Sequence, residues 1–239
     1  MTEAFLNERN AVVTGGTKGI GFAIAKALSG AGANVVICGR TGEGVDNAVR
    51  QLTKHAKNKV AGKVADVRSS TEVADLFAFA DQELSGLDIL VNNAGLGIFR
   101  STQQLTIDEW HTMLETNLSG TFYCSKEALG RMMKRGAGYI INIGSLAGKN
   151  AFAGAAGYNA SKFGLRGFTE AMLLDHRYDN VRVSHIMPGS VDTDFSTRSG
   201  GAEWKIAPED IGQIVLMLLR MPERTLVSQV EVRPSKPKK

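Results

Sequence analysis

The segment Ala11-Val12-Val13-Thr14-Gly15-Gly16-Thr17-Lys18-Gly19-Ile20-Gly21 decides the fold class of this chain. Strand-forming residues from Ala11 to Thr14 run into a glycine-rich loop, and an apolar helical pattern from Ile20 to Leu28 follows. Glycines let the backbone turn tightly and approach a phosphate, which the free N–H groups at the start of a helix can bind. The spacing Gly-x-x-x-Gly-x-Gly therefore indicates either a tight connection or a nucleotide-binding loop.

Strand-like and helix-like stretches alternate along the rest of the chain. This alternation predicts an α/β fold with a parallel sheet of about seven strands and helices on both faces. No linker or repeat divides residues 1–239, so we expect one domain. After the first strand and helix, the expected strands are Asn34–Cys38, Val60–Val64, Asp88–Asn92, Tyr139–Ile143, Val181–Met187 and Leu226–Val232. The expected helices are Val45–His55, Ser70–Leu84, Ile107–Arg135, one that follows Tyr158, and Pro208–Arg220.

Composition excludes several classes of function. The chain is 43% hydrophobic and 22% charged, with 28 basic and 24 acidic residues, and no basic stripe with interleaved aromatics that nucleic-acid binding would need. Cys38 and Cys124 form no metal or redox spacing, so no metal site is expected. The N-terminus lacks the apolar core of a signal peptide, and no apolar run approaches the length of a membrane span. We expect a cytoplasmic protein without membrane or nucleic-acid partners.

A candidate reactive group lies in the segment Tyr158-Asn159-Ala160-Ser161-Lys162. Apolar residues recur at helical spacing after Tyr158, so its phenol and the Lys162 ammonium should share one helix face. A nearby cation favours the phenolate and would lower the pKa of Tyr158 from about 10 toward neutral pH. Ser145 follows the strand Tyr139–Ile143, at the sheet edge where ligands bind. Tyr-x-x-x-Lys alone is weak evidence, but the three groups together suit proton transfer to a carbonyl oxygen.

The end of the second expected strand indicates which dinucleotide the glycine loop would bind. An NAD site places an acid about 20 residues beyond the glycines, where it binds the ribose hydroxyls. Here Val36-Ile37-Cys38 leads into Gly39-Arg40-Thr41, without an acid. Arg40 offers a planar cation to a 2′-phosphate, and Lys18 can approach from the glycine loop. The sequence favours NADP; the alternative is two solvated cations in ordinary turns.

Three further polar positions follow expected strands or interrupt an expected helix. Asp66 and Val67 can place a carboxylate and backbone groups by an adenine edge, or cap a turn. In Asn92-Asn93-Ala94-Gly95, small residues admit a ligand and the amides can pin loop backbone. Asn117 is a poor helix former within an expected helix, where it would bend the helix, hold a water or serve as a buried structural amide.

These motifs follow one another along the chain in the order typical of the short-chain dehydrogenase/reductase family. The sequence resembles that family over nearly its whole length. Pro188-Gly189, followed by Thr193, also stands in family order. The resemblance implies a Rossmann fold, a doubly wound sheet, and hydride transfer between NADP(H) and a carbonyl/alcohol pair. It implies the catalytic residues Asn117, Ser145, Tyr158 and Lys162. The cofactor-binding residues that it implies are Gly15, Thr17, Lys18, Gly19, Ile20, Gly21, Arg40, Thr41, Asp66, Val67, Asn93, Ala94, Gly95, Tyr158, Lys162, Pro188, Gly189, Val191 and Thr193.

The same resemblance implies a role for each of these positions. Tyr158 would be the acid in reduction and the base in oxidation, while Ser145 orients the substrate oxygen. Lys162 would lower the pKa of Tyr158 and hold the nicotinamide ribose, and Asn117 would anchor a water in a proton relay. Thr193 would position the nicotinamide carboxamide. The substrate-covering segment between Thr193 and Pro208 is short for the family, so the resemblance does not identify the substrate.

The expected activity is NADP(H)-dependent reduction of a small-molecule ketone, aldehyde or 3-oxoacyl group, free or bound to a carrier. Many proteins similar to this one are 3-oxoacyl-[acyl-carrier-protein] reductases, and a carrier would need a basic patch such as Arg131, Lys134 and Arg135. The rival hypothesis is a protein that senses NADP(H) without turnover, which would not need all four catalytic residues. The expected apolar residues at the pocket mouth are Leu96, Ile98, Leu146, Phe152, Phe195 and Trp204.

The family resemblance also implies a homodimer or homotetramer. The long helices around 107–135 and 157–177 resemble its dimer interface. Their apolar faces could equally be buried against the sheet.

Overall fold

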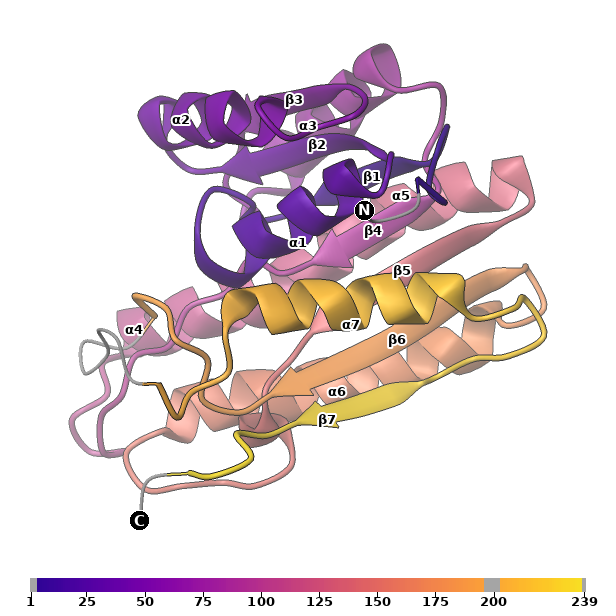
Figure 1. Cartoon of the computed structure of the whole chain (residues 1–239). Coiled ribbons are helices and arrows are strands. Elements are labelled where there is room, and N and C mark those ends of the chain that lie inside the picture. The colour runs from indigo at the N-terminus through magenta and orange to yellow at the C-terminus, as the bar shows by residue number, and fades with distance from the viewer. Residues whose placement is uncertain (1–3, 196–202, 238–239) are drawn as a thin grey trace.

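The structure, a computed structural model of the chain, describes residues 4–195 and 203–237. Within these residues, seven parallel strands form one sheet in the order β3-β2-β1-β4-β5-β6-β7, with helices on both faces (Figure 1). This confirms the expected single-domain, doubly wound Rossmann fold; residues 1–3, 196–202 and 238–239 of the expected domain lie outside the description. The strands are β1 (Asn10–Val13), β2 (Asn34–Gly39), β3 (Val60–Val64), β4 (Ile89–Asn92), β5 (Gly138–Ile143), β6 (Val181–Pro188) and β7 (Gln229–Val232).

Helices connect the strands in the alternating pattern that the sequence predicts. Helices α1, α2 and α7 cover one face of the sheet, and α3, α5 and α6 cover the other (Figure 1). Their bounds are α1 (Gly19–Gly30), α2 (Gly42–Thr53), α3 (Ser70–Glu83), α4 (Ile107–Leu114), α5 (Gly120–Arg135), α6 (Ala156–His176) and α7 (Pro208–Arg220). None of the helices in residues 4–195 and 203–237 combines the length and apolar character that crossing a bilayer requires.

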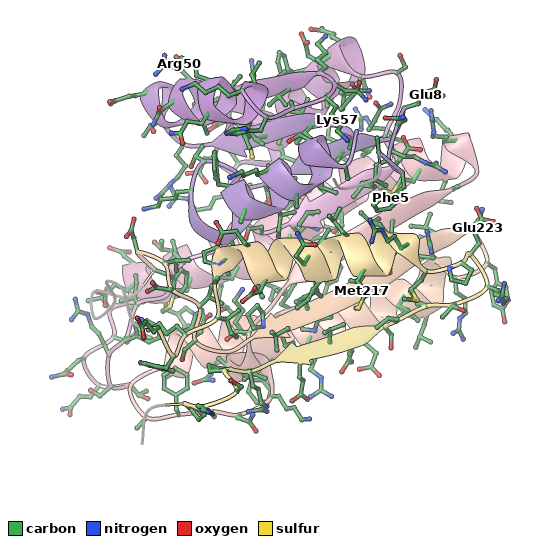
Figure 2. All side chains as sticks on the ribbon, in the orientation of Figure 1. Phe5, Glu8, Arg50, Lys57, Met217 and Glu223 are labelled. Carbon is green, nitrogen blue, oxygen red and sulfur yellow. The ribbon has the colours of Figure 1, made fainter. Side chains whose placement is uncertain are left out.

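Two apolar cores lie on opposite faces of the sheet. Because both faces are covered, β1 and β4 are buried along their whole length, as a parallel sheet requires. Ile24 of α1 and Ile211 of α7 belong to one core, and Phe77 of α3 belongs to the other. Phe5 extends the first core at its border, where the Arg220 guanidinium lies 4.5 Å from its ring centroid (Figure 2).

The strand order reverses between β1 and β4, and this places a crevice above their carboxyl ends. Val13 of β1 pairs with Val91 of β4, and the Thr14 amide continues the ladder to the Val91 carbonyl at 3.0 Å. The loops after β1, β4, β5 and β6 therefore meet at one edge of the sheet. The arrowheads of β6 and β7 point toward this edge in Figure 1.

Helix ends follow the local chemistry of the sequence. The Ser69 hydroxyl caps α3 by accepting a hydrogen bond from the Glu72 amide. Thr106 and Glu109 form a reciprocal capping box at the start of α4. Gly136, with φ of 78°, ends α5 in the left-handed conformation that favours glycine.

Several expected elements differ in detail from the structure; α2, for example, begins at Gly42 instead of Val45. The expected helix Ile107–Arg135 is continuous but contains a π-helical turn at Glu115–Ser119, centred on Asn117. The last strand begins at Gln229, three residues later than expected, and just before it the Val227 carbonyl accepts a hydrogen bond from the Ser184 side chain. The last two differences lie beside side-chain hydrogen bonds between distant segments, which periodicity does not encode.

Candidate active site

The glycine loop after β1 is held tightly against the segment that follows β4. The side-chain nitrogen of Asn93, Nδ2, donates hydrogen bonds to the backbone carbonyls of Thr14 and Gly15, at 3.0 and 3.1 Å. The Thr14 hydroxyl accepts from the amides of Asn93 and Ala94, each at 3.0 Å. Gly15 has φ of +62°, and a β-carbon there would stand 2.9 Å from the Ala94 Cα. Asn93 therefore pins loop backbone, as its position in the sequence suggests.

The start of α1 forms a cradle suited to phosphate groups. Lys18 is exposed at the N-cap, where no side chain caps the helix, and the first turn contains no acid. Both of these features leave the positive end of the helix available to an anion. A β-carbon on Gly21 would collide with Asn93, and one on Gly39 would lie 2.5 Å from Thr17 Cγ2. These two glycines thus let the loop segments pack closely together, and the free N–H groups at the start of α1 fit a dinucleotide pyrophosphate.

Arg40 and Thr41 lie exposed at the carboxyl end of β2. Thr41 serves as the N-cap of α2, because its hydroxyl accepts a hydrogen bond from the Gly44 amide at 3.3 Å. Arg40 lies near enough to Asp66 to contribute to lowering the pKa of that carboxyl. A cation and a hydroxyl therefore stand together beside the crevice, on the side where a ribose 2′-substituent would be recognised.

Asp66 has a partner that sequence reasoning missed. The Arg68 guanidinium donates to both Asp66 carboxylate oxygens, at 2.6 to 3.1 Å, and this is the main cause of the lowered pKa of Asp66. The neighbouring Val67 is buried under the start of α5, where a β-carbon on Gly120 would lie 2.8 Å from Val67 Cγ2. The Asp-x-Arg spacing was the available signal for this ion pair.

Asn117 is buried in the π-helical turn, and its side chain binds the loop after β4. Its Oδ1 accepts from the Leu96 amide at 2.8 Å, and its Nδ2 donates to the Leu96 carbonyl and to the Ser161 hydroxyl at 2.8 and 2.9 Å. Of the alternatives that the sequence left open, the structure supports a local helix distortion together with a structural amide. A β-carbon on Gly95 would lie 3.2 Å from Asn117 Oδ1 and 3.7 Å from Lys162 Nζ, so these groups converge.

Ser145 and Tyr158 bring two hydroxyl groups together at the carboxyl edge of the sheet. Ser145 follows β5, and its Oγ accepts a hydrogen bond from the Ala147 amide at 3.1 Å. Tyr158 lies in the first turn of α6 and is only 7% exposed. Burial raises the pKa of Tyr158 above its ordinary 10.0, and a hydrogen bond with the Ser145 side chain opposes that rise. The pair can donate a proton and a hydrogen bond to one oxygen atom.

Lys162 shares the helix face of Tyr158, as predicted, but it is not what lowers the phenol pKa in this structure. Its Nζ donates to the Ile143 carbonyl at 3.2 Å and lies 5.9 Å from the Tyr158 ring centroid. Burial lowers the pKa of Lys162 itself from 10.5 to about 8. The expected lowering of the Tyr158 pKa is therefore wrong for the protein as it stands: burial dominates, and Ser145 supplies the opposing effect.

The loop after β6 reaches across to the glycine loop. A β-carbon on Gly19 would lie 3.3 Å from Thr193 Cγ2, so Thr193 stands beside the start of α1. Gly189 follows Pro188 at the end of β6, and its amide donates to the Val232 carbonyl at 2.7 Å. Val191 is held by a bridge to Ile206. This loop therefore borders the same crevice as the phosphate cradle.

Half of the expected pocket mouth lies against Tyr158, whereas Phe152 lies 6.1 Å from Phe99, ring centroid to centroid, and Leu146 lies beside Gly189. Leu96 and Ile98 pack against the small cluster that contains Tyr158, and Phe195 lies 5.9 Å from it, ring centroid to centroid. Trp204 instead lines a separate hollow of about 880 Å³ between residues 203–210 and 232–236. Phe99, which sequence reasoning missed, lies 5.5 Å from the Tyr158 ring.

His185 is a second residue that sequence reasoning missed. It is buried on β6, and neither ring nitrogen has a hydrogen-bond partner among the described residues. Burial, together with the charges of Lys162 and Arg166, lowers its pKa to about 4. An isolated histidine within an apolar strand pattern gave no signal of this position.

The basic patch suggested for a carrier protein is largely neutralised. Arg131 contacts Asp81 and Glu127, and Arg135 contacts Asp88. Both arginines lie near the end of α5, just before β5 begins, whereas Ser145 comes after β5 has ended. The basic patch and Ser145 therefore belong to opposite ends of that strand.

Comparisons with known proteins agree with this architecture. The pattern of the family described as short chain dehydrogenase matches residues 9–203. An uncharacterized oxidoreductase of Staphylococcus aureus (strain MRSA252) is 35% identical over 230 residues, 96% of this chain and 98% of that protein. A metagenomic short-chain oxidoreductase in complex with NADP is similar at TM-score 0.85 and 32% identity, covering 97% of this chain and 99% of that one.

A further solved structure is more distant in sequence but close in fold. The alcohol dehydrogenase from the archaeon Thermococcus sibiricus, complexed with 5-hydroxy-NADP, gives a TM-score of 0.90 at 26% identity, covering 97% of this chain and 99% of that one. Together with the family pattern, which spans most of the sequence, these similarities settle the classification. The chain belongs to the short-chain dehydrogenase family of oxidoreductases.

Proposed function

We propose that the protein is an NADP(H)-dependent reductase that converts the carbonyl group of an apolar small molecule to an alcohol, with Tyr158 as proton donor. The observation that carries this proposal is the convergence of Ser145 and Tyr158 at the carboxyl edge of the sheet, close enough for Ser145 to lower the pKa of the phenol, with Lys162 on the same helix face. The glycine loop lies across the same crevice.

The residues of the chain fit the proposed cofactor. The uncapped start of α1 offers N–H groups to the pyrophosphate, and Arg40 and Lys18 offer cations to a 2′-phosphate. The absence of an acid at the end of β2 removes the partner that NAD would need. Both similar structures that hold NADP or its derivative support this choice. NADPH, when bound, supplies the hydride that reduces the carbonyl carbon.

The chain itself supplies orientation and the proton. Ser145 donates a hydrogen bond to the substrate oxygen and fixes it beside the phenol. Tyr158 donates its proton to that oxygen, and its raised pKa keeps the phenol protonated at neutral pH. A phenolate remains after this step. Lys162, whose pKa of about 8 keeps it largely cationic at pH 7, stabilises that charge from the next turn of the helix.

Asn117 supports the site from behind. Its side chain fixes the Leu96 backbone and the Ser161 hydroxyl, and through them it holds the loop after β4 against the start of α6. We infer that it keeps Lys162 and Tyr158 in register and borders the route by which Tyr158 regains its proton. The carbonyl oxygen of a ketone, an aldehyde or a 3-oxoacyl chain can accept the hydrogen bond of Ser145 and the proton of Tyr158 equally well.

The test is a panel of free ketones, aldehydes and 3-oxoacyl thioesters with NADPH, followed at the nicotinamide absorbance. Tyr158→Phe should bind NADPH normally and lower turnover by at least ~10²-fold, the usual scale for a positioned acid. Tyr123→Phe is the matched control, because that tyrosine lies on α5 outside the site.

Normal turnover by Tyr158→Phe would remove the proposed proton donor. Tight NADPH binding without turnover on any panel member would favour the sensing hypothesis.

A further inference from the structure

Three half-exposed phenylalanines surround the proposed proton donor. Phe99 follows β4, Phe152 follows the turn after β5, and Phe195 follows β6; they are 44%, 51% and 44% exposed. Large apolar side chains in water are ordinary when they are scattered singly. Here two phenylalanines from separate loops contact one tyrosine and a third, Phe152, contacts Phe99; we call Phe99, Phe152 and Phe195 the aromatic triad.

Two rings of the triad, Phe99 and Phe195, lie against Tyr158, and the third, Phe152, lies against Phe99. Phe99 lies edge-on to Tyr158, with 5.5 Å between ring centroids and 68° between ring planes. Phe195 lies 5.9 Å from Tyr158 at 54°, and Phe152 lies 6.1 Å from Phe99 at 34°. All these distances fall within the range of attractive ring pairs.

Backbone contacts hold two of these rings in place. Arg100 pairs with Ala155 in a short parallel bridge, which ties the residue next to Phe99 to the residue just before α6. A β-carbon on Gly97 would stand 2.9 Å from Phe99 Cζ and 3.0 Å from Phe195 Cε1. Only the lack of a side chain at Gly97 lets rings from the two loops converge there.

The cations nearest to Phe99 and Phe152 in sequence are paired with carboxylates, whereas Asp194, next to Phe195, is exposed. Arg100 donates to the Glu109 carboxylate at 2.7 Å. Lys149, three residues before Phe152, contacts the Glu231 carboxylate at 2.5 Å. With these cations neutralised, the surface beside Tyr158 offers aromatic faces and edges, together with the two hydroxyls of Ser145 and Tyr158. Such a surface does not suit a carboxylate, a phosphate or a sugar.

We propose that the aromatic triad binds the aryl group of a substrate whose carbonyl is attached directly to the ring, so that aryl ketones and aldehydes are the preferred substrate class. This inference rests on the proposed function for the location of the carbonyl, beside Ser145 and Tyr158. The substrate ring takes up edge-to-face or offset contacts with the phenylalanine rings.

Because of ring contacts, which add to apolar burial, an aryl group should bind more tightly than a saturated ring of similar size. Each favourable ring pair contributes roughly two- to twelvefold to binding beyond the effect of buried area. A cyclohexyl group buries a similar area but lacks the quadrupole that makes these contacts directional. Replacing one phenylalanine by leucine keeps an apolar side chain and removes one ring pair.

The test measures binding without requiring turnover. Benzamide and cyclohexanecarboxamide present the same carbonyl on an aryl and a saturated ring, and neither amide is reduced. Their dissociation constants are measured by ligand-observed NMR with the NADP⁺-loaded protein. We expect benzamide to bind at least about fivefold more tightly, the effect of one to two ring pairs.

Variants separate the triad from general hydrophobicity. Phe99→Leu, Phe152→Leu and Phe195→Leu should each reduce the preference for benzamide by roughly two- to tenfold. Tyr178→Leu, at a tyrosine that is 93% exposed at the end of α6, should leave the preference unchanged. Equal binding of the two amides, or an unchanged preference in all three triad variants, would overturn the inference. A missing turnover with intact aryl preference would count against the proposed function alone.

Discussion

The His185 imidazole fills the space in which a β-carbon on Gly144 would stand. Gly144 immediately precedes Ser145, and its amide donates to the Ile186 carbonyl at 2.7 Å, so the backbone that carries the proposed substrate-binding hydroxyl rests against this buried ring. Within the part of the chain that the structure describes, neither histidine nitrogen has a hydrogen-bond partner. The ring therefore acts here as a spacer, and its protonation is costly.

The first prediction concerns this contact. Gly144→Ala should destabilise the protein by about 1–3 kcal/mol, the usual cost of overpacking a core. In the double variant with His185→Ala, the added methyl group occupies space that the ring has vacated. Urea unfolding of the wild type, both single variants and the double variant should give a favourable coupling of at least about 0.5 kcal/mol. Strict additivity would contradict the contact.

The second prediction concerns acid stability. In the unfolded chain, His185 takes up a proton near pH 6.5, whereas burial delays protonation to about pH 4 in the folded protein. Between these values the unfolded state binds more protons, so the free energy of unfolding falls as the pH is lowered. From pH 7 to 4.5, the wild type should lose on the order of 2 kcal/mol more than His185→Leu. Parallel pH profiles for the two proteins would refute this.

Much of the fold could be predicted from the sequence because its determinants are local. Strand-forming runs of four to eight residues, separated by helical patterns, define a parallel sheet without knowledge of any long-range contact. The π-helical turn at Asn117 could not be predicted in this way. It forms where an amide binds Leu96, 21 residues earlier, and no periodic pattern records that hydrogen bond.

The same distinction between local and long-range determinants applies to the candidate site. Ser145, Tyr158 and Lys162 could be placed together because strand ends share an edge and residues four apart share a helix face. The Tyr158 pKa could not be predicted, since it depends on burial by Phe99 and Phe195, which arrive from other loops. The attraction expected from Lys162 is outweighed by this burial, and its ammonium donates instead to the Ile143 main-chain carbonyl.

The third prediction concerns the pH dependence of the two reaction directions. Because burial raises the pKa of Tyr158, the protonated form that reduction needs persists through neutral pH, and the reduction rate should stay flat there. Oxidation needs the phenolate, so its kcat/KM should rise about tenfold per pH unit in the alkaline range. Ser145→Ala removes the hydrogen bond that lowers this pKa and should move the oxidation profile to higher pH. An unmoved profile would assign the titration to another group.

The fourth prediction concerns self-association through α5 and α6. Phe122 on α5 is 45% exposed and lies edge-on to Phe168 of α6, with 6.0 Å between ring centroids. Phe163 of α6 is 44% exposed. We expect these side chains to be covered in a homodimer or homotetramer. Light scattering at micromolar protein should give a multiple of the chain mass, and Phe122→Glu with Phe163→Glu should lower it. A monomeric wild type would contradict the expectation.

The last prediction is cofactor choice, for which Arg40 carries most of the discrimination. A charge-assisted hydrogen bond to the 2′-phosphate contributes roughly 1.5–3 kcal/mol, so Arg40→Ala should weaken NADPH binding about ten- to a hundredfold and leave NADH nearly unchanged. Arg50→Ala, which removes an exposed cation of α2, is the matched control (Figure 2). Fluorescence titration of both cofactors measures the ratio. Equal binding of NADH and NADPH by the wild type would show that Arg40 is only a surface cation.

The reverse design must respect the packing of the glycine loop. Gly39→Asp would give the ribose hydroxyls an acceptor, but its β-carbon would stand 2.5 Å from Thr17 Cγ2. Thr17→Ser removes that methyl group and keeps the hydroxyl, which lies 3.3 Å from the same point. The triple variant with Thr17→Ser, Gly39→Asp and Arg40→Ala should therefore prefer NADH, whereas the variant without Thr17→Ser should bind both cofactors weakly because the loop is forced apart. If both variants bind NADH equally well, the Thr17 side chain moves aside at little cost, and the loop is less rigid than its contacts indicate.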